Sequence, residues 1–62
     1  MNRNELIKNA QNFVHEKWEQ YQDSKGNDYL EMITRREWSA SIEAIATVLD
    51  MSENEYMELI ES

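Results

Sequence analysis

Residues 35–49 read RREWSASIEAIATVL, and this stretch decides the fold. Its large apolar side chains recur at the three- and four-residue spacing of an α-helix. Small residues flank them, so the apolar arc is unusually wide. A helix of this kind is typically central to a bundle or shared with a partner. The apolar ridge consists of Trp38, Ile42, Ile45 and Leu49.

Two helix starts are predicted from capping signals, one on each side of this region. Thr34 is followed three residues later by Glu37, and Ser52 is followed three residues later by Glu55. A hydroxyl with a Glu at that spacing is a capping box, in which each side chain bonds the other residue's backbone N–H. We therefore predict helices over residues 35–49 and 53–61.

The amino-terminal half predicts one long helix and a turn. Apolar residues between Leu6 and Tyr21 share one arc, which indicates an amphipathic helix over residues 4–21. Residues 23–28 read DSKGND, in which Gly26 suits a left-handed C-cap and Asn27 or Asp28 suits the next N-cap. A short helical turn over residues 29–33 is expected to follow.

The predicted fold is an all-α, small three-helix bundle with this short extra helical turn. Residues 1–62 form a single helical domain, because 62 residues with 40% hydrophobic side chains supply only one small core. One Gly and no Pro favour helices over a sheet. The predicted core consists of Trp18, Trp38, Ile42, Ile45, Leu49 and Ile60.

Charge is distributed very unevenly along the chain. The net charge is −7, from 13 acidic and 6 basic residues. All six bases precede residue 37, so residues 37–62 carry seven acids and no base. Nucleic acid and anionic membranes are disfavoured as direct partners, because phosphate contacts need Lys and Arg.

Catalytic, metal-binding and membrane signals are missing from the sequence. There is no Cys, and His15 with Glu19 supplies only two of the three or more ligands that a metal needs. His15 has no visible nucleophile or orienting partner. No apolar run approaches the roughly 18 residues of a membrane span, and the first residues have no apolar signal region. We predict no enzyme activity, no cofactor and a cytoplasmic location.

Residues 45–52, IATVLDMS, followed by Tyr56 and Ile60, resemble the middle of a helix-turn-helix. The resemblance covers about 20 residues and implies that the last two helices pack loosely as in that motif. Asp50 stands where the motif has Gly. Residues 53–59, in the recognition position, carry no base and three acids, which argues against reading a DNA groove.

The function favoured by the sequence is a non-catalytic, acidic protein-binding module. It would inhibit or modulate a basic, nucleic-acid-handling protein by presenting a DNA-mimic-like surface, in the manner of small phage or mobile-element inhibitors. Two alternatives remain: a homo-oligomeric structural or assembly protein whose acidic face only confers solubility, and a degenerate helix-turn-helix transcription regulator. Self-association, as a homodimer, would use Ala40 and Ala44. The predicted partner-binding residues are Glu43, Asp50, Glu55, Tyr56, Glu58 and Glu61.

Overall fold

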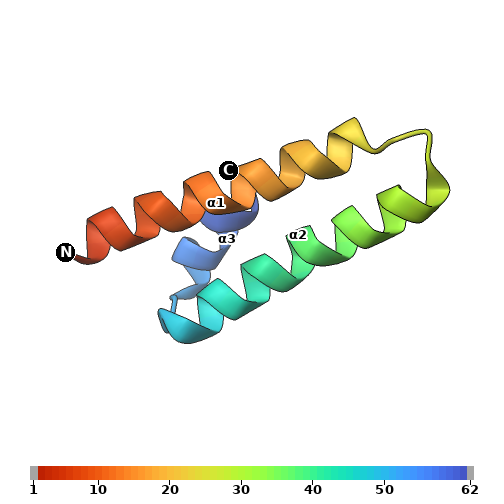
Figure 1. The fold of residues 1–62 in the computed structure, drawn as a ribbon. Coiled ribbons are helices and arrows are strands. Elements are labelled where there is room, and N and C mark those ends of the chain that lie inside the picture. Colours follow the sequence, from red (N-terminus) through yellow and green to blue (C-terminus); the bar gives the residue numbers. More distant parts are fainter. Residues whose placement is uncertain (1, 62) are drawn as a thin grey trace.

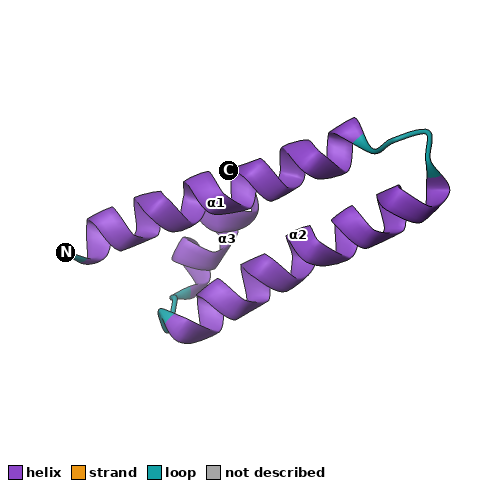
Figure 2. Ribbon diagram, viewed as in Figure 1, coloured by secondary structure: helices purple, strands orange, loops and turns teal. Residues whose placement is uncertain are grey.

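The computed structural model describes residues 2–61 and consists there of three α-helices with no strand (Figures 1 and 2). α1 (Arg3–Asp23) and α2 (Asp28–Val48) form an antiparallel hairpin, and α3 (Glu53–Glu61) lies against its open end. The predicted all-α bundle is confirmed. Nine residues of helix span about 14 Å and 21 residues about 32 Å, so α3 covers less than half the length of the hairpin.

The turn between α1 and α2 follows from its residues. Gly26 has φ +100°, a backbone conformation that favours glycine, as the sequence predicted. Asn27 then caps α2, because its side-chain oxygen accepts a hydrogen bond from the Leu30 N–H at 3.2 Å. Asn2 caps α1 in the same way, accepting from the Glu5 N–H at 2.9 Å. Each cap satisfies an N–H group that has no partner within its own helix.

The prediction of a helix start at Thr34 is wrong, and the separate turn over residues 29–33 does not exist. α2 runs unbroken from Asp28 to Val48. The Thr34 hydroxyl donates to the Leu30 carbonyl oxygen at 2.7 Å, one turn back in the same helix, and lies 2.6 Å from the Ser24 hydroxyl oxygen. Asn27 starts the helix seven residues earlier and no Gly or Pro follows to stop it, so the Thr34 hydroxyl bonds back onto the helix.

The capping box at Ser52 is confirmed in both directions. The Ser52 N–H donates to Glu55 Oε1 at 2.9 Å, and the Glu55 N–H donates to Ser52 Oγ at 3.3 Å. Just before it, Asp50 has φ +49°, which lets the chain turn sharply out of α2. Aspartate tolerates this left-handed conformation better than most residues, so it can stand where a turn glycine is common.

The core is small and lies where α3 crosses the hairpin. Four side chains are buried there, from all three helices: Ala10, Val14, Ile42 and Leu59. Partly buried side chains surround them: Trp38, Ile45, Leu49, Met51, Tyr56 and Ile60. Five of the six predicted core residues are therefore in the cluster. Trp18 is not; it is 38% exposed and stacks on His15, with ring centroids 5.9 Å apart.

Candidate protein-binding surface

The acids of residues 37–62 divide into two groups according to their ion pairs. Glu55 lies 2.8 Å from Arg3, and Glu37 lies 3.9 Å from Lys17 (carboxylate oxygen to side-chain nitrogen). Among residues 2–61, no ion pair reaches the other five acids, which are all exposed. These five are Glu43, Asp50, Glu53, Glu58 and Glu61. A positively charged partner would meet this second group.

Arg3 joins the beginning of α1 to the junction between α2 and α3. Its guanidinium donates to both carboxylate oxygens of Glu55, at 2.8 and 3.2 Å. It also donates to the backbone carbonyl oxygens of Leu49 at 2.9 Å and Asp50 at 3.4 Å. A two-point contact between guanidinium and carboxylate fixes geometry as well as charge. One side chain therefore ties the beginning of α1 to a junction that lies more than 45 residues away in the sequence.

The pKa of Glu55 reflects this arrangement. The hydrogen bond from Arg3, assisted by the Ser52 backbone N–H, lowers the pKa of Glu55 from 4.5 to about 2. The same contact raises the pKa of Arg3. Glu55 is a predicted partner-binding residue, but its carboxylate is already occupied by Arg3 and by the Ser52 backbone N–H. We therefore leave it out of the candidate surface.

The outer side of α3 carries the remaining acids of that helix. Glu53, Met57 and Glu61 follow one another at four-residue spacing, and Glu58 lies beside this line. All four side chains are exposed, on the side of the helix opposite buried Leu59. Met57 is 49% exposed and lies among the three carboxylates. We call these four residues the α3 acidic face.

Tyr56 is half-buried and packs toward α2. It packs against the core and lines a hollow of about 170 Å³ together with Trp38, Ile60 and Glu43. The hollow brings together two predicted binding residues, Tyr56 and Glu43, that belong to different helices. Asp50 lies apart from them, in the turn after α2. Only Glu58 and Glu61, of the six predicted residues, belong to the α3 acidic face.

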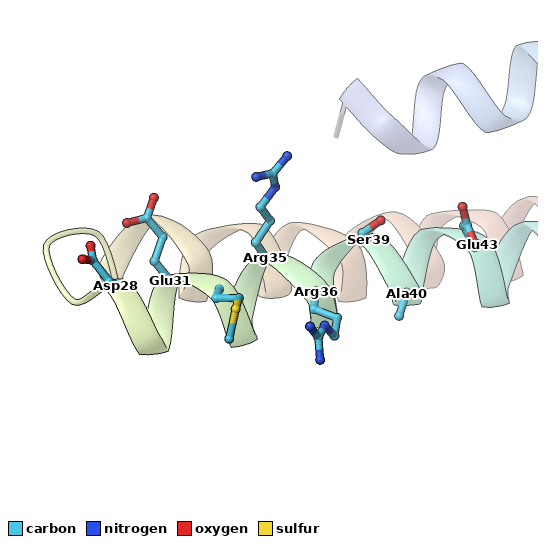
Figure 3. A pocket seen from close by; sticks show the side chains of 8 residues that line it. Asp28, Glu31, Arg35, Arg36, Ser39, Ala40 and Glu43 are labelled. Atoms are coloured by element: carbon cyan, nitrogen blue, oxygen red, sulfur yellow. The ribbon is translucent and has the colours of Figure 1, made fainter.

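A second surface runs along the outside of α2 and has mixed charge (Figure 3). In Figure 3, Glu31, Arg35, Ser39 and Glu43 point toward the side on which α3 lies, whereas Arg36 and Ala40 point away from it. Three acids and two arginines line it, so no strong field of one sign results. The residues that line this surface are Asp28, Glu31, Met32, Arg35, Arg36, Ser39, Ala40 and Glu43.

The predicted self-association residues lie on two different surfaces. Ala40 is on the outer surface of α2, whereas Ala44 lines an apolar groove between α1 and α2. Only one polar residue, Asn9, contributes to the groove, whose other lining residues are Leu6, Ala10, Ala44, Ile45, Val48 and Leu49. The sequence alone could not place Ala44 opposite α1, because its partners there are more than 30 residues away in the chain.

No group of three His, Asp or Glu side chains in residues 2–61 is arranged to hold a metal ion. In the same part of the chain, none of the helices combines the length and the apolar character that crossing a bilayer requires. His15 Nε2 lies 2.7 Å from Glu19 Oε1 across one helical turn, in an exposed position on α1.

Comparisons of the chain with protein-family models, with curated proteins and with solved structures find no match.

Proposed function

We propose that this chain is a non-catalytic module that binds a basic protein through the α3 acidic face. The observation that carries the proposal is the arrangement of Glu53, Glu58 and Glu61 around exposed Met57, with no basic residue anywhere on α3. Exposed charges of one sign speed the approach of an oppositely charged partner and orient it.

Met57 gives the proposed contact an apolar centre. Exposed charges at the edge of a contact contribute little to affinity by themselves, because water and salt screen them. An apolar side chain that is desolvated in the middle of a contact contributes more per residue. Methionine is flexible and polarizable, so it adapts to an irregular partner surface. The α3 acidic face thus has carboxylates that orient an approaching partner and one apolar side chain that adds desolvated contact area.

The proposed partner is a protein that handles nucleic acid. Such proteins present Lys and Arg where phosphates bind, and three carboxylates on one helix face offer those side chains a substitute. The chain would inhibit or modulate its partner by occupying that surface, in the cytoplasm, as small phage inhibitors do. The mechanism is occupancy and needs no bond to be made or broken.

Direct DNA binding is the less favoured function. In a helix-turn-helix, the second helix enters the major groove. The corresponding helix here is α3, whose outer side carries Glu53, Glu58 and Glu61. These carboxylates would repel phosphates, so we expect the protein alone to leave the mobility of duplex DNA unchanged in a gel shift.

The experiment that tests the proposal is affinity capture from source-cell lysate, read by mass spectrometry. The test variant is Glu53→Gln/Glu58→Gln/Glu61→Gln, which removes three charges and keeps the side-chain shapes. Glu55 is left intact because its loss would disturb the junction with Arg3. The matched control is Glu16→Gln/Glu19→Gln/Asp23→Asn, which removes three exposed charges from α1. Circular dichroism checks that both variants fold.

The proposal predicts a basic protein captured by the native chain and by the control, and lost by the test variant. Capture should also weaken between about 50 mM and 500 mM salt, because the Debye length falls from about 14 Å to about 4 Å over that range. A partner that the test variant retains as well as the native chain does would refute the proposal.

A further inference from the structure

Within residues 2–61, one side of the α1–α2 hairpin has no helix packed on it. α3 packs on the other side, where Tyr56 and Ile60 share a hollow with Ser39 and Glu43 of α2. Ala44 and Val48 lie on the opposite side of α2, given the 3.6-residue period of the helix. In Figure 1, α3 passes behind α1, so this second side of the hairpin faces the viewer.

Apolar side chains line the uncovered side near the open end of the hairpin. Val48 is 81% exposed and Phe13 is 47% exposed, which is unusual for side chains of this type. The groove between the helices there has a volume of about 370 Å³. We define the uncovered hairpin face by its exposed apolar residues and one ion pair: Leu6, Phe13, Leu30, Ala44 and Val48, with Lys17 and Glu37.

Five of the seven residues of this face lie at seven-residue intervals. Leu6 and Phe13 are seven apart on α1, and Leu30, Glu37 and Ala44 are seven apart on α2. Seven-residue spacing keeps one seam of a helix in contact with a partner helix. The small side chain of Ala44 permits a close approach between helices, which pack 8 to 10 Å apart depending on the side chains at the contact.

The uncovered hairpin face is electrically neutral, although the chain carries −7. Its two charged side chains, Lys17 and Glu37, lie 3.9 Å apart, and the Lys17 ammonium lies 5.4 Å from the centre of the Phe13 ring. The α3 acidic face is on the other side of the hairpin. A second copy of the chain can therefore approach this face without meeting the charges that repel it elsewhere.

The size of the face suits a small dimer. The molecule measures 38 × 16 × 16 Å, so one long side covers about 600 Å². Two copies that cover this whole side would bury about 1,200 Å² together, which is the lower end of the range for specific, stable interfaces. A monomer with four buried side chains would gain considerably from this burial, because domains of about 60 residues are marginally stable alone.

We propose that two copies of this chain associate through the uncovered hairpin face. α1 and α2 of both copies then form a four-helix bundle, with each α3 on the outside. The contact is isologous, since each copy offers the same residues to the other. The proposal is independent of the partner proposed for the α3 acidic face, which stays accessible in the dimer.

The test is the mass of the native chain in solution, measured by light scattering at about 100 µM, a concentration at which a micromolar dimer is populated. The proposal predicts twice the chain mass of 7.4 kDa. The variant Ala44→Glu/Val48→Glu places two charges on the face at exposed helix positions and should have the single-chain mass. The control Met57→Glu/Asn54→Glu adds the same charge to exposed positions of α3 and should have the double mass.

Unchanged circular dichroism in both variants shows that the mass reports association and not unfolding. A native chain of single mass at 100 µM would overturn the proposal. So would a dimer that survives Ala44→Glu/Val48→Glu, because the interface would then lie elsewhere. Dissociation by the α3 control alone would identify α3 as the interface and overturn it as well.

Discussion

Replacing Leu59 by Ala tests whether α3 is an integral part of the fold. Leu59 is the largest fully buried side chain and belongs to the cluster that joins all three helices. Leu→Ala substitutions at fully buried positions cost about 2.7 to 5 kcal/mol, depending on how far the site collapses around the cavity. α3 is short and packs at the edge of the hairpin, so it can move inward, and we expect a loss of about 3 kcal/mol.

A loss of that size is large for this chain. Stabilities of about 0.05 to 0.15 kcal/mol per residue give about 3 to 9 kcal/mol for 62 residues. The loss corresponds to a fall in melting temperature of about 12 to 24 °C, since each kcal/mol shifts a domain of this size by about 4 to 8 °C. Thermal and urea unfolding, followed by circular dichroism at 222 nm and at one fixed protein concentration, would measure it.

The matched control is Met57→Ala, two residues away on the exposed side of α3. That substitution removes a side chain similar in size to leucine, from a position that is 49% exposed. It should therefore change the free energy of unfolding by less than about 0.5 kcal/mol. If Leu59→Ala and Met57→Ala had equal effects, α3 would not be packed on the hairpin as described. The same result would remove the basis for an ordered α3 acidic face.

Three further predictions follow from the local structure. Thr34→Ala should leave the free energy of unfolding within about 0.5 kcal/mol of the native value, because Thr34 lies inside a helix. Ser52→Ala should cost about 1 kcal/mol, because it removes a helix cap. Equal losses for the two variants in urea unfolding would contradict this. Glu55→Gln should lower stability at pH 7. The folded pKa of Glu55, about 2, lies below its ordinary value of 4.5, so the stability gained from Arg3 is complete above pH 4.5 and is lost as the pH falls through 2. The difference from the native chain should therefore shrink steadily below pH 4.5, and an undiminished difference at pH 2 would contradict the ion pair. Gly26→Ala should lower the free energy of unfolding by about 1 kcal/mol, because alanine disfavours the positive φ at this position. An added Cβ has no described neighbouring atom within 4 Å, so no clash adds to this loss. If Gly26→Ala left stability unchanged in the same assay, the turn would have another conformation.

The helical architecture could be predicted from the sequence because its signals are local. The spacing of apolar residues in α1 and α2, Gly26 in the turn and the Ser52–Glu55 capping box all act within a few residues. The error at Thr34 shows the limit of this method. A capping box and an interior threonine have the same local sequence, and what decides between them is whether an upstream residue, here Asn27, has already begun the helix.

The candidate surface was less predictable because it depends on tertiary contacts. Arg3 and Glu55 are 52 residues apart, and only the crossing of α3 over the hairpin brings them together. Trp18 lies in the predicted apolar arc of α1, but α3 is too short to cover it. In contrast, the exposure of Glu58 and Glu61 follows directly from the helical period once α3 is placed. Glu53 was not among the predicted binding residues. It is the first residue of α3, next to the Ser52 cap, and the structure places it on the same face as Glu58 and Glu61.

The most direct test of the central claim is the salt dependence of binding between the purified chain and its captured partner. The account predicts that affinity falls steeply with salt for the native chain, and that Glu53→Gln/Glu58→Gln/Glu61→Gln both weakens binding and flattens this dependence. Equal salt dependence for the native chain and this variant would contradict the claim that the α3 acidic face makes the contact.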